Sequence, residues 1–578
     1  MPNTSASPAS LPDRRVVATA GKAPARGWSF FFFGLLFLSL AHAGERPPAA
    51  AVASAHPAAT RAGVEILQAG GNAFDAAVAV SAALAVVEPY SSGLGGGGFW
   101  LLHRASDGHE VMIDGREKAP LAAHRDMYLD ARGEPLAGAS IDGPLAAGIP
   151  GEPAALVHIA GRYGRLPLAR SLAPAIRLAR EGFRVDEHYR RMAAFRLDAL
   201  RGSPAAAGLF LLNNEVPPQG YLVRQPDLAR TLQALAREGR AGFYEGDIAR
   251  QLVREVRRYG GIWTLEDLRQ YEVKERRPVT GSYRGWRVVS AAPPSSGGVV
   301  LLEMLNMLAL RDLRAMSKAG KVHYLAEVMR RAYADRARWL GDADFVGMPL
   351  KRLLSGAYAR ELVKGIDMKK ATASSRLPSV RPEGHDTTHF SILDGEGNRV
   401  AATLSINYPF GSGFVAGNTG VLLNDEMDDF SIKPGVANVY GLVGAEANAI
   451  EPGKRMLSSM TPTFIENDDH VAILGTPGGS RIITMVLLGL LEVVDGKDVR
   501  TWVRRPRFHH QYLPDVIQLE PGALDEDLKA ALMNMGHRLD EKSRPWGNMQ
   551  AVHWNRRAGK VEAASDPRGG GSAMVLPQ

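Results

Sequence analysis

The stretch Asp386-Thr387-Thr388-His389-Phe390-Ser391 decides the fold of this chain, together with the residues that follow it as far as Phe430. It has the character of a concealed N-terminus. A threonine hydroxyl is a poor nucleophile unless a base lies beside it, and the α-amine of the same residue is one such base. That amine exists only after the preceding peptide bond is cut. The sequence therefore predicts cleavage between Asp386 and Thr387, which gives Thr387 both a nucleophile and its base.

The residues after this point predict a β-hairpin. Apolar and polar residues alternate over 388–393 and again over 399–406, on either side of a Gly-rich and Asn-containing loop. If the loop spans residues 394–398, Thr387 lies directly opposite Ser405. Because cross-strand partners are about 5 Å apart, the hairpin places a second hydroxyl beside the proposed nucleophile.

A second turn carries chemistry further along the chain. Residues 476–480 (TPGGS) lie between an apolar strand at 471–475 and a buried type of helix at 482–494. Gly478 and Gly479 leave backbone N–H groups free near a helix N-terminus, where negative charge is favoured. An acyl-transfer enzyme needs such donors for its oxyanion. The alternative is an ordinary tight turn.

The rest of the chain predicts a mixture of helices and strands, with a mainly helical region over 150–275. We expect an exposed polar segment over 364–386, where a chain cut is tolerated, and a loose Ala- and Pro-rich segment over 44–55. The other expected elements are helices over 60–68, 73–87 (capped by Asn72), 297–310 and 321–340, and strands over 99–103 and 111–114.

Composition describes an ordinary globular protein. The chain has 578 residues, of which 45% are hydrophobic and 22% charged. The net charge is +8, or +5 without residues 1–43, and no long basic run is present, so we expect no nucleic-acid partner. The absence of cysteine excludes disulfides, thiolate metal sites and a cysteine nucleophile.

The first 43 residues predict a signal peptide. Four basic residues precede an apolar run over 28–40, and Ala41-His42-Ala43 supplies a cleavage site. The run is short for a membrane span of about 20 residues, although an uncleaved anchor is the alternative. We expect a periplasmic or secreted protein, exported by either the general or the twin-arginine route.

Two other patterns have simpler explanations. Gly93 to Gly98 matches a dinucleotide fingerprint, but it follows a helix and enters a strand, the reverse of the required order. We expect close backbone packing there and no cofactor. His385 and His389 with Asp386, or His509-His510, are poor metal candidates because ligands on one strand converge badly. His389 also remains an alternative base, against a packed strand histidine.

Longer motifs resemble the γ-glutamyltranspeptidase family, and the likeness covers essentially everything after the signal peptide. Downstream motifs lie at Asp386–Phe430, Gly435–Thr463 (GVANVYGLVGAEANAIEPGKRMLSSMTPT) and Gly475–Val486 (GTPGGSRIITMV). Upstream motifs lie at Gly71–Trp100, Asp114–Pro120 (DGREKAP) and Gly148–Leu156 (GIPGEPAAL).

The resemblance implies an α+β fold, the four-layer αββα sandwich of the N-terminal-nucleophile hydrolases. It implies a precursor that cuts itself into a large subunit, 44–386, and a small catalytic subunit, 387–578, which stay associated. Thr387 would attack the γ-amide carbonyl of glutathione or a similar γ-glutamyl compound. The resulting γ-glutamyl ester would pass to water or to the amine of an amino acid or peptide.

The resemblance also assigns roles at the site. It implies that Ser405 supports the nucleophile and that Gly478 and Gly479 bind the oxyanion. The residues that would hold the glutamyl group are Arg116 with Ser458 and Ser459 at the α-carboxylate, Asp429 with Glu426 and Asn407 at the α-ammonium, and Tyr440 in a mobile lid.

Some positions depart from the family pattern. Ser405 stands where threonine is common, Glu426 where glutamine is common, and Met456 where proline is common. These changes bear on rate and donor choice. A cephalosporin (glutaryl) acylase-like amidase is the alternative activity, but a glutaryl group has no ammonium for Asp429 and Asn407. A non-catalytic binding protein on the same scaffold would have to lack the nucleophile or the glycine turn.

Overall fold

The hairpin predicted after Thr387 lies at the centre of a seven-stranded sheet. The computed structural model describes residues 46–374, 387–433, 435–438 and 441–577. Within the hairpin, Leu393 pairs with Arg399 and Thr388 with Leu404, which is the predicted register. One further step in this register brings Thr387 opposite Ser405.

The first sheet is antiparallel throughout. Its strands, in spatial order, are β18 (Ser572–Pro577), β1 (Ala49–Ser54), β9 (Thr388–Leu393), β10 (Arg399–Ser405), β2 (Gly97–Arg104), β3 (His109–Gly115) and β6 (Lys274–Arg276).

The prediction of a loose segment over 44–55 is wrong for its second half, because β1 is a buried inner strand. Ala51, Val52 and Ala53 are fully buried. Val52 pairs with Met574 on one side and with Ile392 on the other. Alanine-rich composition indicated a flexible end, but small side chains also suit a strand packed closely on both faces. Its partners come from distant parts of the chain, which a local pattern does not report.

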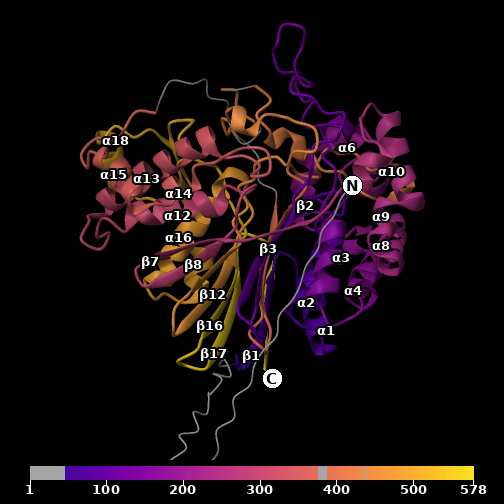
Figure 1. The fold of residues 1–578 in the computed structure, drawn as a ribbon, viewed down its shortest axis with the longest axis horizontal. Coiled ribbons are helices and arrows are strands. Elements are labelled where there is room, and N and C mark those ends of the chain that lie inside the picture. Colours follow the sequence, from indigo (N-terminus) through magenta and orange to yellow (C-terminus); the bar gives the residue numbers. More distant parts are fainter. Residues whose placement is uncertain (1–45, 375–386, 434, 439–440, 578) are drawn as a thin grey trace, which may run out of the picture. The chain divides into compact units, whose positions relative to one another are not determined.

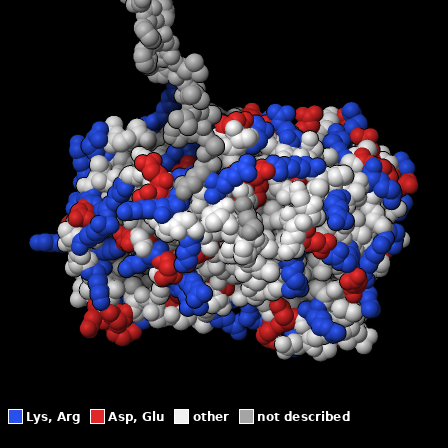
Figure 2. Space-filling view, turned by 90° about the horizontal axis from the view of Figure 1, so that it is seen from below, with Lys and Arg blue, Asp and Glu red and all other residues white. Residues whose placement is uncertain are grey.

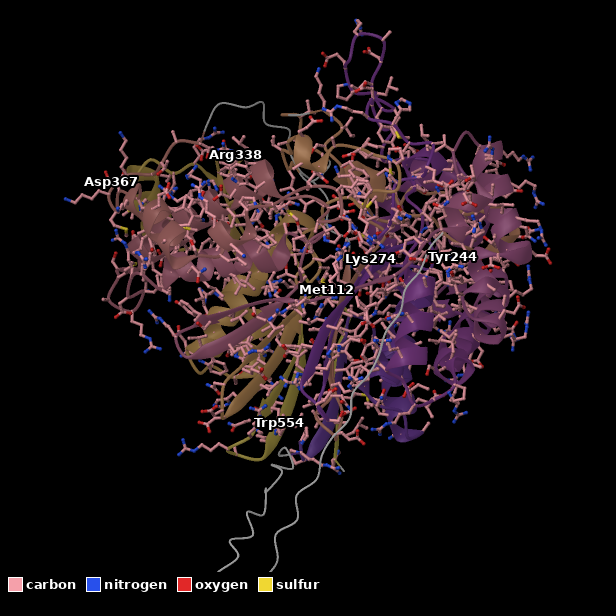
Figure 3. All side chains as sticks on the ribbon, in the orientation of Figure 1. Met112, Tyr244, Lys274, Arg338, Asp367 and Trp554 are labelled. Carbon is pink, nitrogen blue, oxygen red and sulfur yellow. The ribbon has the colours of Figure 1, made fainter. Side chains whose placement is uncertain are left out.

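The second sheet is also antiparallel. Its order is β17 (Lys560–Ser565), β16 (Gln550–Asn555), β12 (His470–Gly475), β11 (Thr463–Glu466), β8 (Trp286–Ser290) and β7 (Val279–Tyr283). The two sheets face each other across one apolar layer, to which Leu101, Ala401, Phe464, Ile473 and Trp554 contribute. Figure 3 labels Trp554 among these strands.

Helices cover the outer face of each sheet (Figure 1). Helices α1 (Pro57–Gln68), α2 (Ala73–Val87) and α3 (Glu152–Arg162) pack on the first sheet. Farther along the chain on the same side follow α4 (Leu168–Glu181), α5 (Glu187–Phe195), α6 (Leu197–Arg201), α7 (Pro204–Phe210), α8 (Pro226–Glu238), α9 (Ala241–Tyr244), α10 (Gly246–Arg258) and α11 (Leu265–Arg269). On the second sheet lie α12 (Gly297–Leu308), α13 (Lys318–Trp339), α14 (Leu350–Leu353), α15 (Gly356–Lys364), α16 (Ile482–Val494), α17 (Val499–Arg504) and α18 (Glu526–Asn534). The predicted αββα sandwich and the helical region over 150–275 are confirmed.

Two small sheets complete the described structure. One contains β13 (Phe508–His509), β14 (Ile517–Leu519) and β15 (Leu539–Glu541), and the other pairs β4 (Phe183–Arg184) with β5 (Leu222–Val223).

Helix α2 shows how local sequence fixes an element that supports the site. Its N-terminus is capped by Asn72, whose side chain accepts hydrogen bonds from the N–H groups of Phe74 and Asp75. The Asp75 carboxylate in turn accepts a hydrogen bond from the Asn72 N–H. All its residues are buried, and it packs on β9 and β10. Helix α2 therefore supports strand β9, which begins beside Thr387, by packing against its outer face.

The predicted signal peptide, residues 1–43, lies outside the described residues. Over the part of the chain that the structure covers, we find no helix with the length and apolarity that crossing a membrane requires. On the face seen in Figure 2, basic and acidic side chains are interspersed instead of forming a field of one sign.

Candidate active site

A small pocket beside Thr387 brings together the end of β10, the start of α16 and the loops around them. Its volume is about 20 Å³, room for no more than a water molecule or two. The predicted site residues that line it are Arg116, Thr387, Ser405, Asn407, Glu426, Asp429, Ser458, Ser459 and Gly479. Gly478 instead lines a larger cavity that also reaches Thr387. Tyr440 lies outside the described residues, although Leu442 two residues later lines the pocket.

Arg116 forms the electrostatic centre of this pocket. It follows β3 directly and is fully buried. Its Nη1 donates a short hydrogen bond to Glu426, and its Nη2 lies 2.5 Å from Asp429 Oδ2. Glu117 lies 3.5 Å from the same guanidinium. The residues assigned to the two ends of the substrate are thus paired with each other.

Three carboxyl groups share this single guanidinium, and their protonation reflects it. Burial lowers the pKa of Arg116, but Glu426, Asp429 and Glu117 outweigh burial and leave that pKa above its usual value. Burial raises the pKa of Glu426 to about 7, with Arg116 opposing and Asp429 adding to the rise. Burial, followed by the charge of Glu426, raises the pKa of Glu117 well above its usual value. Burial therefore favours the neutral forms of Glu117 and Glu426, and a cation bound beside them would favour their charged forms.

A tight turn presents the two acidic residues to the pocket. Residues Glu426–Asp429 form a 3₁₀ helix, and the Asn424 side chain fixes its start by accepting from the Glu426 N–H at 2.9 Å and donating to the carbonyls of Gly95 and Gly148. The Oε1 of Glu426 is buried without a hydrogen-bond partner in the described part of the chain. A buried unpaired acceptor costs free energy, which an incoming N–H donor would recover.

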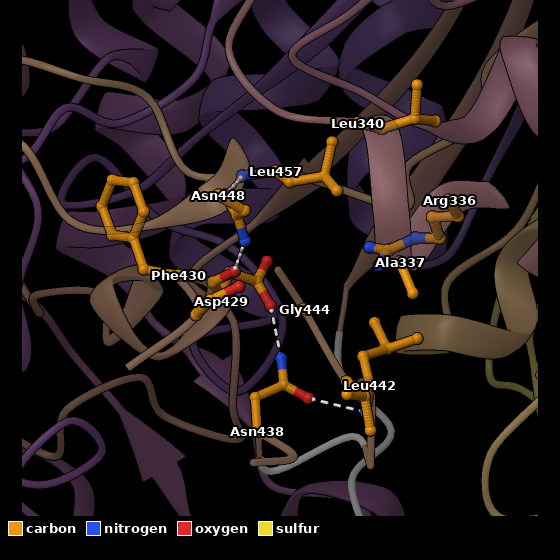
Figure 4. Close-up of a pocket in the computed structure, with 12 residues that line it drawn as sticks. Arg336, Ala337, Leu340, Asp429, Phe430, Asn438, Leu442, Gly444, Asn448 and Leu457 are labelled. Carbon is orange, nitrogen blue, oxygen red and sulfur yellow. Dashed lines mark hydrogen bonds between the residues drawn. The ribbon is translucent and has the colours of Figure 1, made fainter. Parts of the chain in front are cut away.

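A second, smaller cavity adjoins the pocket behind Asp429 (Figure 4). Asn438 Nδ2 donates to Asp429 Oδ1 at 3.2 Å, and Asn438 Oδ1 accepts from the Leu442 N–H at 3.1 Å. Leu442 lines both spaces. The chain on either side of residues 439–440 is thereby tied to the acidic wall of the pocket.

Ser458 and Ser459 form the opposite wall, and their hydrogen bonds set which way their hydroxyls donate. Ser458 Oγ accepts from the Met460 N–H at 3.1 Å. Ser459 Oγ accepts from Arg336 Nη2 at 3.0 Å. Because each oxygen already accepts from a group that can only donate, each hydroxyl proton stays available to an acceptor, such as a carboxylate bound in the pocket.

Arg336 is the residue at this site that the sequence analysis missed. It is buried on α13, donates also to Ser296 Oγ at 2.9 Å, and forms no ion pair with a described residue. Tyr333, one turn earlier on the same helix face, donates to the carbonyl oxygen of Ser480. The signal available in the sequence was a tyrosine and an arginine spaced i, i+3 within the predicted helix over 321–340.

The glycine turn predicted for the oxyanion is present. Gly478 and Gly479 have φ of +135° and +55°, which only glycine adopts without strain, and a Cβ on Gly478 would lie 2.6 Å from the Met485 methyl group. Residues Gly479–Arg481 form a 3₁₀ turn that leads into α16. Neither glycine N–H donates a hydrogen bond to another residue in the described ranges.

The run of glycines at 93–98 packs closely behind the hairpin, as predicted. A Cβ on Gly95 would lie 2.0 Å from the Leu422 carbonyl oxygen, and one on Gly96 would lie 2.2 Å from that of Ser405. The run lets the chain pass directly against the end of β10.

His389 is packed in the interior between the two sheets. Its Nδ1 lies 2.8 Å from Thr403 Oγ1 and its Nε2 lies 3.2 Å from Ser391 Oγ, while its ring lies against Gly475. Burial lowers its pKa to about 3. These contacts match a packed strand histidine, and His389 does not line the pocket of Thr387.

One group of side chains has the spacing of metal ligands. His323, Glu327 and His537 bring their ligand atoms within 4.8 Å of one another. However, His323 Nδ1 lies 2.7 Å from His537 Nε2, and both oxygens of Glu327 accept hydrogen bonds, including a bond of 2.6 Å from Arg331. The group is therefore already paired internally, and it does not line the pocket of Thr387.

An αββα sandwich with a threonine at the head of an inner strand, facing a pocket and a glycine turn, defines the class of N-terminal-nucleophile hydrolases. The gamma-glutamyltranspeptidase family model matches residues 59–576, and the chain belongs to this family.

Similar proteins extend over nearly the whole chain. It is 45% identical over 510 residues to the glutathione hydrolase proenzyme of Pseudomonas sp. (strain A14), covering 86% of this chain and 88% of that protein. It is 43% identical over 528 residues to the glutathione hydrolase proenzyme of Escherichia coli (strain K12), covering 89% and 90%. The crystal structure of cephalosporin acylase from Bacillus halodurans has a TM-score of 0.80 at 27% identity, covering 92% of this chain and 96% of that one.

Proposed function

We propose that this protein transfers the γ-glutamyl group of glutathione and other γ-glutamyl compounds to water or to the amine of an amino acid or peptide. The observation that carries the proposal is the buried charge cluster of Arg116, Glu426 and Asp429, which lines the same pocket as Thr387.

The α-amino acid end of a γ-glutamyl group matches the charges of this cluster, and its binding would open the present ion pairs to make room in the small pocket. Its carboxylate can replace the acidic partners of Arg116, and its ammonium can then pair with Asp429 and with the unpartnered Oε1 of Glu426. Each ion pair that opens is replaced by another, so no buried charge remains alone. That exchange avoids the cost of an unpaired buried charge.

A glutaryl group lacks this balance, which argues against the acylase-like alternative. It brings a carboxylate without an ammonium, so it would displace Glu426 and Asp429 from Arg116 and leave both without a cation. The excess of carboxyl groups around Arg116 then repels the substrate.

Within this proposal, Thr387 Oγ attacks the γ-carbonyl carbon while the α-amine of Thr387 takes its proton. The N–H groups of Gly478 and Gly479 hold the oxyanion, and Ser405 and Asn407 position the nucleophile and the ammonium end. The hydroxyl protons of Ser458 and Ser459 assist Arg116 at the α-carboxylate. The α-amine returns its proton to the leaving amine, which leaves a γ-glutamyl ester on Thr387 for water or a second amine to attack.

We further propose the maturation and location that this chemistry requires. Cleavage at Asp386–Thr387 would separate a large subunit, 44–386, from a small subunit, 387–578, and removal of residues 1–43 would accompany export to the periplasm or the exterior. Tyr440 would belong to a segment that closes over the donor and bonds Asn407.

Comparison of two chromogenic donors tests the activity directly. The processed protein should release p-nitroaniline from γ-glutamyl-p-nitroanilide and discriminate strongly against glutaryl-p-nitroanilide. Equal kcat/KM for the two donors would instead favour the acylase-like amidase. Failure to hydrolyse either donor would leave the binding-protein reading as the better one.

A further inference from the structure

Thr387 lines two spaces: the small pocket proposed above for the donor, and a larger cavity that is distinct from the one behind Asp429. The second is a cavity of about 630 Å³, which Thr387 and Gly478 also line. Such a volume is ordinary for a small-molecule site. If the glutamyl chain of the ester points into the small pocket, a group leaving or attacking its carbonyl carbon must approach from another side. The cavity adjoins the nucleophile and the glycine turn on such a side.

The cavity has one buried acidic group close to the nucleophile. Glu88, the C-cap of α2, is 4% exposed and accepts a hydrogen bond of 2.7 Å from the hydroxyl of Thr388, the residue after the nucleophile. No arginine, lysine or histidine of the described chain lies within ion-pairing distance of Glu88. Burial raises its pKa to about 7. A buried carboxyl group that faces a cavity without a cation is suited to an ammonium group.

The rim of the cavity is basic. Five lysine or arginine side chains line the space, against the two acidic side chains of Glu88 and Asp186. Arg481 and Arg568 are engaged in the framework, because Arg481 bonds Gln518 and Arg568 bonds Glu520.

Two other rim arginines remain available to a ligand. Arg544 is exposed and forms no hydrogen bond or ion pair with any residue that the structure describes. Arg191, on α5, is exposed and donates only to His188 Nδ1, at 2.7 Å. The cavity thus has a carboxyl group at its buried end and, at its exposed end, two guanidinium groups that no described carboxylate pairs with.

We propose that this cavity is the binding site for the second substrate, a short peptide, with its ammonium at Glu88 and its carboxylate at Arg191 and Arg544. The inference rests on the proposed γ-glutamyl transfer and specifies which acceptors that reaction uses.

The proton balance of transfer follows from this placement. The acceptor ammonium gives one proton to the Glu88 carboxylate and becomes an amine. Its lone pair attacks the carbonyl carbon of the γ-glutamyl ester, a C–N bond forms, and the bond from that carbon to Thr387 Oγ breaks. Thr387 Oγ takes the second proton from the attacking nitrogen through the α-amine of Thr387. Glu88 then releases its proton to solvent.

The test measures transfer and hydrolysis in the same reaction. Processed enzyme is given γ-glutamyl-p-nitroanilide with glycylglycine as the acceptor, and γ-glutamyl-glycylglycine and free glutamate are quantified separately. Hydrolysis without acceptor reports on the proposed function alone, because it needs no second substrate. The ratio of transfer to hydrolysis reports on the cavity.

For Arg544→Gln and for Arg191→Gln we expect the acceptor KM to rise about 2- to 5-fold, since exposed ion pairs are individually weak. The double variant should show about a tenfold rise. Glycylglycinamide, which lacks the carboxylate, should be the weaker acceptor for the unmodified enzyme and should lose that disadvantage in the double variant. Arg338→Gln is the matched control, an exposed arginine on α13 outside the cavity (Figure 3).

For Glu88→Gln, which keeps an oxygen to accept from Thr388, we expect the ratio of transfer to hydrolysis to fall about tenfold or more. Two results would overturn the inference: equal acceptor KM for the unmodified enzyme and the double arginine variant, or equal use of glycylglycine and its amide by the unmodified enzyme. If Glu88→Gln fails to fold, the arginine variants can still contradict the inference by themselves.

Discussion

At the scale of single residues, charge balance decides what the pocket accepts. Arg116 is already satisfied by Glu426 and Asp429, so affinity depends on the difference between the pairs that open and the pairs that form. A ligand with both charges replaces each ion pair that it opens. A ligand with only a carboxylate leaves the displaced carboxylates of the protein buried without a cation.

Neutral substitutions of Asp429 and Arg116 should therefore affect a γ-glutamyl donor and a glutaryl donor differently. Asp429→Asn should raise the KM for γ-glutamyl-p-nitroanilide about 10- to 150-fold, since a charge-assisted hydrogen bond contributes about 1.5–3 kcal/mol. Its effect on glutaryl-p-nitroanilide should be small or favourable, because a repelling charge is removed. Arg116→Gln should weaken both donors. Steady-state kinetics with the two donors distinguish these cases, and an equal loss for both donors in Asp429→Asn contradicts the ammonium role.

Arg336 offers a test of hydroxyl orientation. Arg336→Gln should raise the donor KM about tenfold with a smaller change in kcat, because Ser459 loses the donor that turns its proton into the pocket. The loss should disappear for 4-aminobutanoyl-p-nitroanilide, which lacks the α-carboxylate, and Ser459→Ala should not add to it. An equal loss for both donors, or full additivity with Ser459→Ala, would show that Arg336 serves only the fold. Arg338→Gln controls for charge on the same helix.

The titration of Glu426 predicts proton-linked binding. Its pKa of about 7 in the empty pocket reflects burial first. We expect a bound ammonium to lower that pKa, because its contact with Oε1 more than replaces the weakened contact with Arg116. The bound state then holds fewer protons, so affinity increases as pH rises through the pKa. A decrease in that pKa of about one unit corresponds to about tenfold in affinity. Inhibition by L-glutamate should strengthen from pH 6 to pH 8, and Glu426→Gln should remove most of this trend.

At the scale of elements, local sequence was sufficient wherever an element depends on its own periodicity and caps. The bounds of α2 and α16 and the register of the β9–β10 hairpin agree with the predictions. Strand β1 was missed because its burial comes from β18 and β9, neither of which is near it in sequence. The resemblance gathered the site residues, but the direct pairing of Arg116 with Asp429 required coordinates.

The course of strand β9 distinguishes the two candidate bases, the α-amine of Thr387 and the side chain of His389. Its alternation sends His389 into the layer between the sheets, where both ring nitrogens have partners. His389→Asn in protein that has already been processed should keep activity within about tenfold, with the acidic limb of the kcat/KM profile in place. That limb then belongs to the α-amine of Thr387, whose free value is about 7.7–8.0. A loss of the limb, or a drop of about 10³-fold in correctly cut protein, would assign the base to His389.

At the scale of the whole molecule, the two proposed subunits share both sheets. Strand β1, upstream of the proposed cut, lies between β18 and β9, which are both downstream. In the second sheet, upstream β8 pairs with downstream β11. Separation of the pieces would therefore expose unpaired strands in both sheets, and no loop outside the sheets needs to hold them together.

This interleaving makes maturation testable by mass. Intramolecular attack of the Thr387 hydroxyl on the Asp386 carbonyl, followed by ester hydrolysis, should give fragments of about 37 and 21 kDa, in proportion to 62.2 kDa for 578 residues. The smaller fragment should begin with Thr387 by N-terminal sequencing. The two should elute together in native gel filtration and separate only under denaturing conditions. Thr387→Ala should remain uncut, while Thr388→Ala, one residue later, should still be cut. An enzyme that is fully active as a single chain under denaturing conditions would contradict the concealed N-terminus, because without cleavage Thr387 has no α-amine to act as its base.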